Sequence, residues 1–395
     1  MDLHWTQEEA RLYQLAAVGL HGRRYPEGED GIRGAFRDLR AVQLDPLPIL
    51  GRNHDLVFQS RVGGTHPGMF LDLLHRERLG FEYWDKMLCA VPIEEFPLLR
   101  ALMEAGGERW ERLREDRLDR DHPGAKNAVL EAVRGNGPLS SAELRKLAVA
   151  QGSHRGWKTT QAAGAALEVL WNKGRLCVSH RVNYRRYFDL TERVIPQRLL
   201  AQDAPDGVEF LRRLLLKRVD MVGLLPAGGA AETWMSLRQA RRDGLPQQMV
   251  EEEDLARVHV DGVRTSFYVR PDAAKILREA EKVPLDDRAR MIAPLDPLVW
   301  CRDALAKVWG FTYAWEVYKK PEQRAYGYYV LPVLYQNRFV GRFDGRYDGK
   351  TRTLHVLGYW AEKDGLSFEH PAIREAFGRF LDYLGGKSTA WPARP

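Results

Sequence analysis

Hydrophobic residues recur at helical spacing near the start of the chain. Apolar positions from Leu12 to Leu20 are three or four residues apart, which predicts a helix over about 7–20. Thr6 and Glu9 have the spacing of a capping box at the beginning of this helix. A second helix is expected over about 31–40, and it leads directly into the segment Ala41–Arg61.

The most regular pattern lies in the middle of the chain. Helices are predicted over 127–134, at a Ser-capped segment GPLSSAELRKLA, and over 159–174, where Gly174 ends the third helix. Two β-rich runs follow at 175–180 and 184–190, separated by a short polar turn. Three helices followed by a hairpin are typical of a winged helix-turn-helix module, whose third helix and wing commonly face DNA.

A related plan is predicted after Pro196. Helices are expected over 212–225 and 230–244 and strands over 247–260 and 265–271, with Asp261-Gly262 as a two-residue hairpin signal. Beyond about Asp286, APLDPLVWCRDAL, AWEVYKKP and later segments read as alternating strands of a small curved sheet or partial barrel, before a final helix over 371–384.

These patterns together predict an α+β fold of tandem winged-helix domains followed by a small C-terminal β-barrel-like domain. A charged stretch ending near a Pro-Gly break places one boundary close to Asp121. We expect four domains. They are a winged-helix-like domain at 1–121, a winged-helix domain with a basic wing at 122–195, a third winged-helix-like domain at 196–285, and a β-rich domain at 286–395.

Composition adds limits on the compartment and the partner. The chain has 395 residues, of which 60 are basic and 54 acidic, giving a net charge of +6, a mild indication of a polyanionic partner. Its three cysteines are far apart and form no CxxC pair, which favours a reducing, cytoplasmic location. The amino terminus has no basic leader followed by an apolar run, and no stretch approaches eighteen uninterrupted apolar residues, so export and membrane spanning are not expected.

The segment Ala41–Arg61 is the candidate site. If 42–45 is extended, Gln43 and Asp45 project from the same face while Leu44 points into the core. An alternative is that Asp45 caps a helix whose first residue is Pro46, and the two interpretations are compatible. Basic residues farther along, Arg52, His54 and Arg61, are candidate phosphate contacts, although a charged helix face is an equal alternative.

The predicted wing combines basic and aromatic side chains. This pattern suits phosphate contact and stacking on bases or sugars. The candidate DNA-binding residues of the wing are Arg175, Arg181, Tyr184, Arg185 and Arg186, with His180 and Tyr187 beside them.

Five segments carry a resemblance to a known family. They are QLD at 43–45, GPLSSAEL at 137–144, ALEVLWNKGRL at 166–176, APLDPLVWCR at 293–302 and YGYYVLPVLYQNRFVGRFD at 326–344. In this order and spacing the chain resembles the bacterial winged-helix DNA glycosylases of the AlkZ and YcaQ type. Family members often have Ser or Thr directly after the first motif, whereas this chain has Pro46.

The resemblance implies tandem winged-helix domains around double-stranded DNA and hydrolysis of the N-glycosidic bond of bulky or cross-linked N7-alkylated purines. The family's catalytic Gln, apolar residue, Gln or Asp motif corresponds here to Gln43 and Asp45, in the Asp form of the YcaQ-like branch. Asp45 would accept a proton from water or stabilise an oxocarbenium-like centre, and Gln43 would hold the water or the sugar. An N7-alkylated guanine is already cationic, so it departs without a general acid.

Other functions are less well supported by the residues. No lysine stands out as a Schiff-base nucleophile, so a monofunctional hydrolase is expected. The histidines contain no HExxH or close pair, and we expect neither a metal nor a cofactor. The main alternative is a non-enzymatic winged-helix regulator or architectural protein, and a nucleotide-handling enzyme lacks its Gly-rich motifs. We further expect a monomer, associated with the nucleoid, that binds no membrane.

Overall fold

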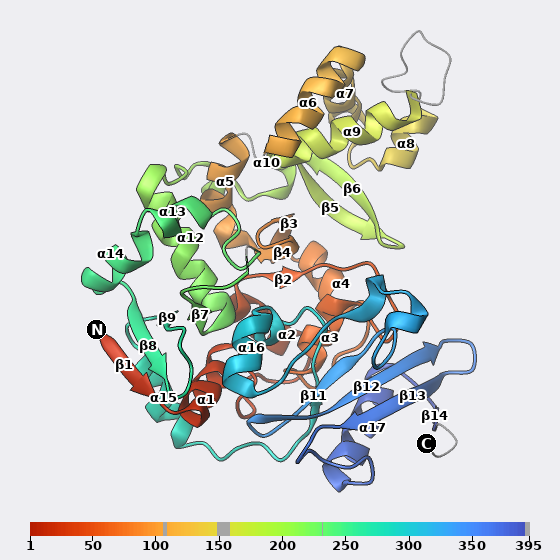
Figure 1. The fold of residues 1–395 in the computed structure, drawn as a ribbon. Helices are drawn as coiled ribbons and strands as arrows, with labels where there is room; N and C mark the ends of the chain where they lie inside the picture. The colour runs from red at the N-terminus through yellow and green to blue at the C-terminus, as the bar shows by residue number, and fades with distance from the viewer. Residues whose placement is uncertain (106–108, 148–158, 231, 392–395) are drawn as a thin grey trace. The chain divides into compact units, whose positions relative to one another are not determined.

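The computed structural model describes residues 1–105, 109–147, 159–230 and 232–391. The chain forms two compact units, the first comprising Met1–Phe70, Trp84–Cys89 and Leu214–Pro395, and the second comprising Leu71–Tyr83 and Ala90–Arg213. Each unit contains both helices and strands (Figure 1), as the predicted α+β class requires. The four predicted domains, and the assignment of winged-helix modules among them, stay predictions.

The first unit begins with a strand and three helices that enclose an apolar core. Thr6 caps the first helix, since its hydroxyl accepts from Glu9 N at 3.2 Å and Glu9 accepts from Thr6 N at 2.7 Å, so the predicted capping box is confirmed. Phe36, Phe58 and Phe70 lie against one another in this core. The elements are β1 (Asp2–Trp5), α1 (Gln7–Ala17), α2 (Gly28–Leu39), β2 (Val42–Gln43), α3 (Asn53–Gln59) and α4 (Met69–Arg76), which enters the second unit.

A four-stranded sheet in the order β1-β8-β9-β7 brings the amino terminus of the first unit beside residues about 255 positions later. Asp2 pairs with Arg257 in parallel register, and Ala256 pairs with Val269 in antiparallel register. The chain in this region forms α12 (Gly207–Val222), β7 (Leu225–Pro226), α13 (Arg238–Arg242), α14 (Leu245–Glu251), β8 (Ala256–Val260), β9 (Phe267–Val269) and α15 (Ala273–Glu281). The part of α12 before Leu214 belongs to the second unit.

Three sequence predictions in this region need correction. The strand predicted over 247–260 is real only at β8, because Leu245, Met249 and Val250 are buried at helical spacing and form α14. The helix predicted over 230–244 is reduced to α13. The hairpin at Asp261-Gly262 exists, but its strands end at Val260 and resume at Phe267, so its loop is longer than two residues.

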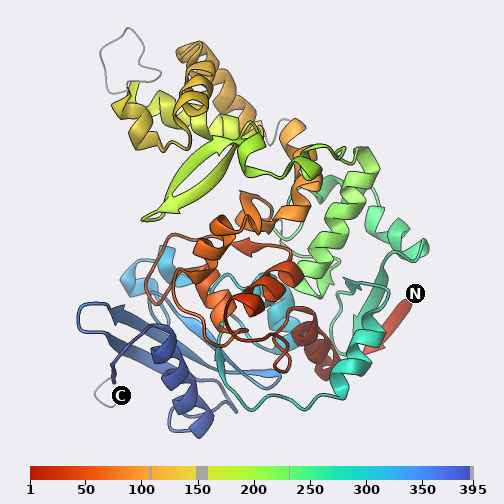
Figure 2. The same cartoon turned by 180° about the vertical axis from the view of Figure 1, so that it is seen from behind.

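The C-terminal part of the first unit is a five-stranded sheet in the order β10-β11-β12-β13-β14. Bulges between Val333 and Leu334 and between Asp344 and Gly345 interrupt its register, and such bulges bend and twist strands. α17 packs on this sheet (Figure 2). The ring centroids of Phe377 in this helix and Phe343 in the sheet are 4.8 Å apart. The strands are β10 (Arg290–Met291), β11 (Leu331–Tyr335), β12 (Arg338–Asp348), β13 (Thr353–Ala361) and β14 (Ser388–Ala390), and the final helix is α17 (Pro371–Tyr383).

The strands predicted at APLDPLVWCRDAL and AWEVYKKP are wrong. These residues form short helical elements, because Asp296 caps a turn through Leu298 N and Leu305, Val308 and Trp309 are buried at helical spacing. The elements are η2 (Pro297–Val299), α16 (Arg302–Trp309), η3 (Glu316–Tyr318) and η4 (Pro321–Gln323).

The second unit contains the predicted order of three helices and a hairpin, here α7, α8, α9, β5 and β6. Ser140 caps α8 in a capping box with Glu143, and Gly174, in the left-handed region at φ +65°, follows the end of α9. Figure 2 shows the hairpin extending from these helices. The elements that lie wholly or partly in this unit are β3 (Gly80–Trp84), β4 (Leu88–Pro92), η1 (Ile93–Glu95), α5 (Phe96–Glu104), α6 (Arg109–Asp121), α7 (Ala125–Asn136), α8 (Ser141–Lys146), α9 (Thr159–Asn172), β5 (Leu176–Val182), β6 (Arg185–Leu190), α10 (Thr191–Val194) and α11 (Gln197–Leu200). The end of β3 and the start of β4 belong to the first unit.

Three properties of the described residues concern membranes, metals and thiols. None of their helices is both long and apolar enough to cross a membrane. They contain no group of three His, Cys, Asp or Glu side chains placed to hold a metal ion. Cys89, Cys177 and Cys301 are buried free thiols.

Candidate functional site

Gln43 and Asp45 lie where a short strand ends. The extended geometry is confirmed for Val42 and Gln43, which form β2, and Leu44 N donates a hydrogen bond of 2.9 Å to Leu88 O. Leu44 is buried in the core, while Gln43 and Asp45 keep 9% and 8% of their surface exposed. Both polar side chains therefore sit in a largely desolvated part of the first unit, at its accessible margin.

The capping interpretation of Asp45 is wrong. No helix begins at Pro46, and α3 starts only at Asn53. Pro48 disfavours a helical conformation for Leu47, so a helix cannot start cleanly at Pro46. Asp45 Oδ1 instead accepts a hydrogen bond from Leu47 N at 2.9 Å, which is the geometry of an Asx turn.

The other Asp45 oxygen, Oδ2, has no hydrogen-bond partner in the described parts of the chain. Burial raises the pKa of the Asp45 carboxyl above its ordinary value, and the hydrogen bond from Leu47 N opposes part of this shift. A carboxylate whose pKa is raised is a better proton acceptor than an ordinary one. Asp45 thus combines a fixed orientation with one oxygen available to a ligand or water.

The Gln43 side chain also carries an unused acceptor. Its Oε1 is buried and has no hydrogen-bond partner among the residues described. Leaving a buried acceptor unsatisfied costs about 1–3 kcal/mol, and a catalytic role or a bound water is among the explanations for such a group.

Asn53, at the start of α3, holds the backbone of the motif in place. Its Nδ2 donates to Gln43 O at 2.9 Å, and its Oδ1 accepts from Leu295 N at 2.9 Å. Asn53 is fully buried. The sequence gives no signal for this role, because one partner is 242 positions away in the chain.

Arg61, the last residue of the segment Ala41–Arg61, forms a buried ion pair. Its guanidinium contacts Asp296 through two hydrogen bonds, of 2.6 and 2.9 Å, and also donates to Val18 O and Val57 O. Both charged side chains are fully buried. This packing favours a structural role for Arg61 over the predicted contact with DNA.

The two remaining basic candidates near the motif differ in exposure. His54 is fully buried, with its ring 6.1 Å from that of Phe70, which places it in the interior. Arg52 is half-buried and precedes the first residue of α3. Of the three basic residues predicted here, Arg52 alone reaches the surface to any extent.

The wing residues of the second unit divide into two groups. Arg175 and Arg185 are exposed. Arg181 instead donates to both oxygens of Glu82, at 2.7 and 2.6 Å, and Arg186 pairs with Glu168. Tyr184, at the hairpin turn, stacks under Arg181 with 4.2 Å between guanidinium carbon and ring centroid. Arg181 and Arg186 therefore form ion pairs inside the second unit.

Lys86 was missed by the sequence analysis. Its ammonium lies 4.7 Å from the centroid of the Trp300 ring, and burial lowers its pKa to about 8. Two residues later, Leu88 O accepts from Leu44 N within the motif. A largely buried lysine with a lowered pKa is a potential nucleophile.

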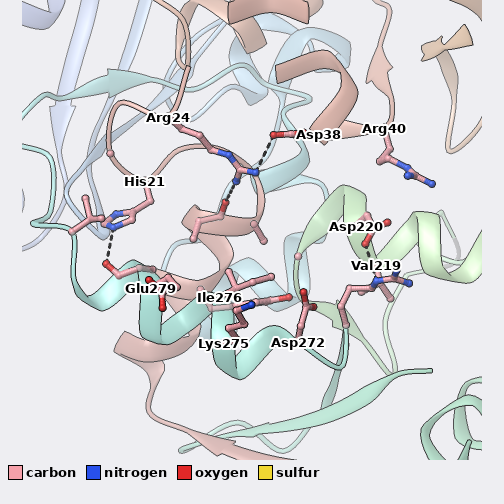
Figure 3. A pocket seen from close by; sticks show the side chains of 18 of the residues that line it. His21, Arg24, Asp38, Arg40, Val219, Asp220, Asp272, Lys275, Ile276 and Glu279 are labelled. Carbon is pink, nitrogen blue, oxygen red and sulfur yellow. Dashed lines mark hydrogen bonds and ion pairs between the residues drawn. The ribbon is translucent and has the colours of Figure 1, made fainter. Parts of the chain in front are cut away.

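A pocket of about 770 Å³ lies elsewhere in the first unit, among α1, α2, α12 and α15 (Figure 3). It is lined by six cationic side chains and four carboxylates. Arg24 pairs with Asp38 at 2.9 Å, and His21 bonds to Ala280 O (Figure 3). Its excess of cationic groups suits an anion, but neither Gln43 nor Asp45 lines it.

Two comparisons with known proteins agree with this picture. The fold is similar to that of the Streptomyces sahachiroi DNA glycosylase AlkZ, with a TM-score of 0.61, 16% sequence identity, and coverage of 98% of this chain and 99% of that one. The model of the AlkZ-like DNA glycosylase family matches residues 36–383, a range that includes Gln43, Asp45 and Asn53. The chain therefore belongs to the AlkZ-like family of DNA glycosylases, which are DNA repair enzymes.

Proposed function

We propose that this glycosylase hydrolyses the N-glycosidic bond of N7-alkylated purines in double-stranded DNA. One observation carries the proposal: Gln43 Oε1 is a buried acceptor without a partner among the described residues, two positions before Asp45, whose carboxylate is fixed through Oδ1 by Leu47 N, on a backbone that Asn53 and Leu88 hold. A rigid support of this kind is what a site for positioning water requires.

The chemistry follows from the charge of the leaving group. An N7-alkylated purine is cationic, so the bond between C1′ and the base breaks as the purine takes the bonding electrons and becomes neutral. Asp45 then accepts a proton from the water that attacks C1′, or stabilises the positive charge there. Gln43 holds that water, or the deoxyribose, through its amide.

The same reasoning extends to larger lesions. A purine cross-linked through N7 is also cationic, so an interstrand cross-link would be released by the same step. Because a bulky adduct does not fit a snug pocket, we propose that the base is handled at an open surface. The protein would act as a monomer on DNA, with Arg52, Arg175, Tyr184 and Arg185 among its contacts.

A bifunctional glycosylase is the second candidate, and Lys86 favours it. Its amine would attack C1′ in place of water, release the purine, form a Schiff base with the opened sugar and lead to strand cleavage. Borohydride separates the two mechanisms, because it traps a Schiff base as a stable protein–DNA adduct. We expect no adduct with the wild-type protein. An adduct that forms with wild type and not with Lys86→Arg would show that Lys86 attacks C1′ and that the protein is a bifunctional glycosylase.

The direct test is incubation with duplex DNA containing one N7-methylguanine. We expect free N7-methylguanine and an abasic site, detected by cleavage with alkali. An undamaged duplex of the same sequence is the control. Sequence-selective binding without base release would instead support a non-enzymatic regulator.

A further inference from the structure

The segment Trp315–Tyr328, between α16 and β11, presents a very exposed aromatic side chain. Tyr318 has 83% of its surface exposed, the largest fraction among the exposed large hydrophobic residues of the described chain. Lys320, two positions later, is also exposed. A single exposed ring is ordinary on its own, but a ring beside an exposed lysine offers both a stacking face and a positive charge.

Buried carboxylates hold this loop in one conformation. Glu316 accepts hydrogen bonds from Ala325 N and Tyr326 N, both at 3.0 Å to Oε2, and from Lys319 Nζ at 2.7 Å. Burial alone would raise the pKa of Glu316, but these donors lower it to about 2. The loop is therefore closed by a carboxylate that stays ionised at neutral pH.

The far end of the loop is fixed in the same way. Asp344 accepts from Tyr328 N and Tyr329 N, each at 3.1 Å. Gly327 is required at this point, because a Cβ added there would lie 2.0 Å from Asp344 Oδ2. A loop fixed at both ends presents Tyr318 with little further loss of conformational entropy on binding.

The loop is connected to the candidate active segment within the same unit. Trp315 contacts the Tyr329 ring at 6.0 Å, and Tyr329 OH donates to Gly51 O at 3.4 Å. Gly51 is six residues after Asp45, a chain length that spans at most roughly 20 Å. A duplex that presents its lesion to Asp45 would thus have neighbouring nucleotides near this loop.

We propose that this loop is a preformed DNA contact in which Tyr318 stacks on a base beside the lesion, while Lys320 and Arg324 neutralise flanking phosphates. Arg324 is ordered over Tyr328, with 4.8 Å to the ring centroid. The exposed Lys320 and the half-buried Arg324 near a stacking ring suit nucleic acid, whereas lysines are depleted at protein interfaces. The inference rests on the proposed glycosylase function.

Binding to a duplex with one tetrahydrofuran abasic analogue, which cannot be hydrolysed, tests the loop apart from catalysis. We expect Tyr318→Ala to weaken binding at least about 5-fold, the lower end for loss of one base stack, and Tyr318→Phe to remain within about 2-fold of wild type. Leu357→Ala is the matched control, because Leu357 is 52% exposed on β13 and has no role in the proposed contacts. Lys320→Ala should reduce the slope of log affinity against log salt by about 0.9.

A 2-aminopurine placed next to the analogue reports stacking directly. Its fluorescence should change on binding of wild type and Tyr318→Phe and not on binding of Tyr318→Ala. Equal affinity and equal fluorescence for all three proteins would overturn the inference and leave a protein partner as the explanation of the exposed ring. Release of N7-methylguanine by wild type is measured in parallel, so that failure of the chemistry is distinguished from failure of the loop.

Discussion

Asn53 Nδ2 donates a hydrogen bond of 2.9 Å to Gln43 O, and so ties the start of α3 to the strand that carries the candidate catalytic motif. The same side chain accepts from Leu295 N. One buried amide thus connects three separate segments of the first unit. The position of the Gln43 backbone therefore depends on the Asn53 side chain, which belongs to a different element.

Asn53→Ala tests this positioning role. We expect excision to fall about tenfold, because loss of the buried amide leaves Gln43 O and Leu295 N unsatisfied and lets the strand move. The affinity for duplex DNA should stay within about 2-fold. Asn136→Ala is the control, since Asn136 is exposed and its side chain donates to Ala132 O within its own helix. An equal loss of affinity and of excision would indicate a general loss of folding instead.

The pH dependence of excision reports the state of Asp45. Because burial raises the pKa of Asp45, a smaller fraction is ionised at a given acidic pH than for an ordinary carboxyl group. Excision should therefore decline, as pH falls, around a midpoint above 3.8, after subtraction of spontaneous depurination. The excision rate is measured against pH under single-turnover conditions. If Asp45→Asn shows the same decline at acidic pH, the decline belongs to the titration of another group.

Arg185 is the clearest test of the wing. The residue is exposed, so Arg185→Ala should weaken DNA binding and reduce the salt slope by about 0.9 for each lost phosphate contact. Arg213→Ala removes the same charge from the same unit, where Arg213 pairs with Glu209, and should leave the slope unchanged. A slope unchanged in Arg185→Ala would mean that this part of the hairpin faces away from DNA.

Glu82 and Arg181 form an ion pair that should make the second unit sensitive to acid. Burial would raise the pKa of Glu82, but Arg181 and His75 lower it to about 2, compared with an ordinary 4.5. Its contribution to the free energy of unfolding is therefore complete above about pH 4.5 and is lost as pH falls toward 2. Thermal unfolding between pH 6 and pH 3 measures this loss.

Variants of the pair supply the control for this experiment. Glu82→Gln alone should destabilise the unit by about 3–5 kcal/mol, because Arg181 keeps a buried charge without its partner. The double variant Glu82→Gln with Arg181→Met removes both charges and should lose most of the acid sensitivity. An unchanged pH dependence in the double variant would show that other groups control acid unfolding.

Local signals predicted much of the fold. The capping boxes at Thr6 and Ser140, the end of α9 near Gly174 and the hairpin after it are set by neighbouring residues and were found where expected. The prediction fails where a helical and a strand pattern occur in the same segment. At 245–260 the apolar spacing of Leu245, Met249 and Val250 forms a helix before the strand begins.

The candidate site was only partly predictable for a physical reason. Gln43 and Asp45 could be chosen because strand geometry relates residues two apart. Asn53, which fixes the Gln43 backbone, is itself bonded to Leu295, and these tertiary contacts have no characteristic sequence spacing. The charge of a side chain does not show whether that side chain is buried. Arg61 is an example, because it forms an ion pair with Asp296 in the interior of the protein.

The most direct test of the account is single-turnover release of N7-methylguanine by wild type and Asp45→Asn. The substitution keeps the size of the side chain and an oxygen that can accept from Leu47 N, but removes the proton acceptor. We predict that excision falls at least about tenfold, while affinity for the duplex is nearly unchanged. Release by Asp45→Asn at the wild-type rate would contradict the assignment of Asp45 as the group that acts on water.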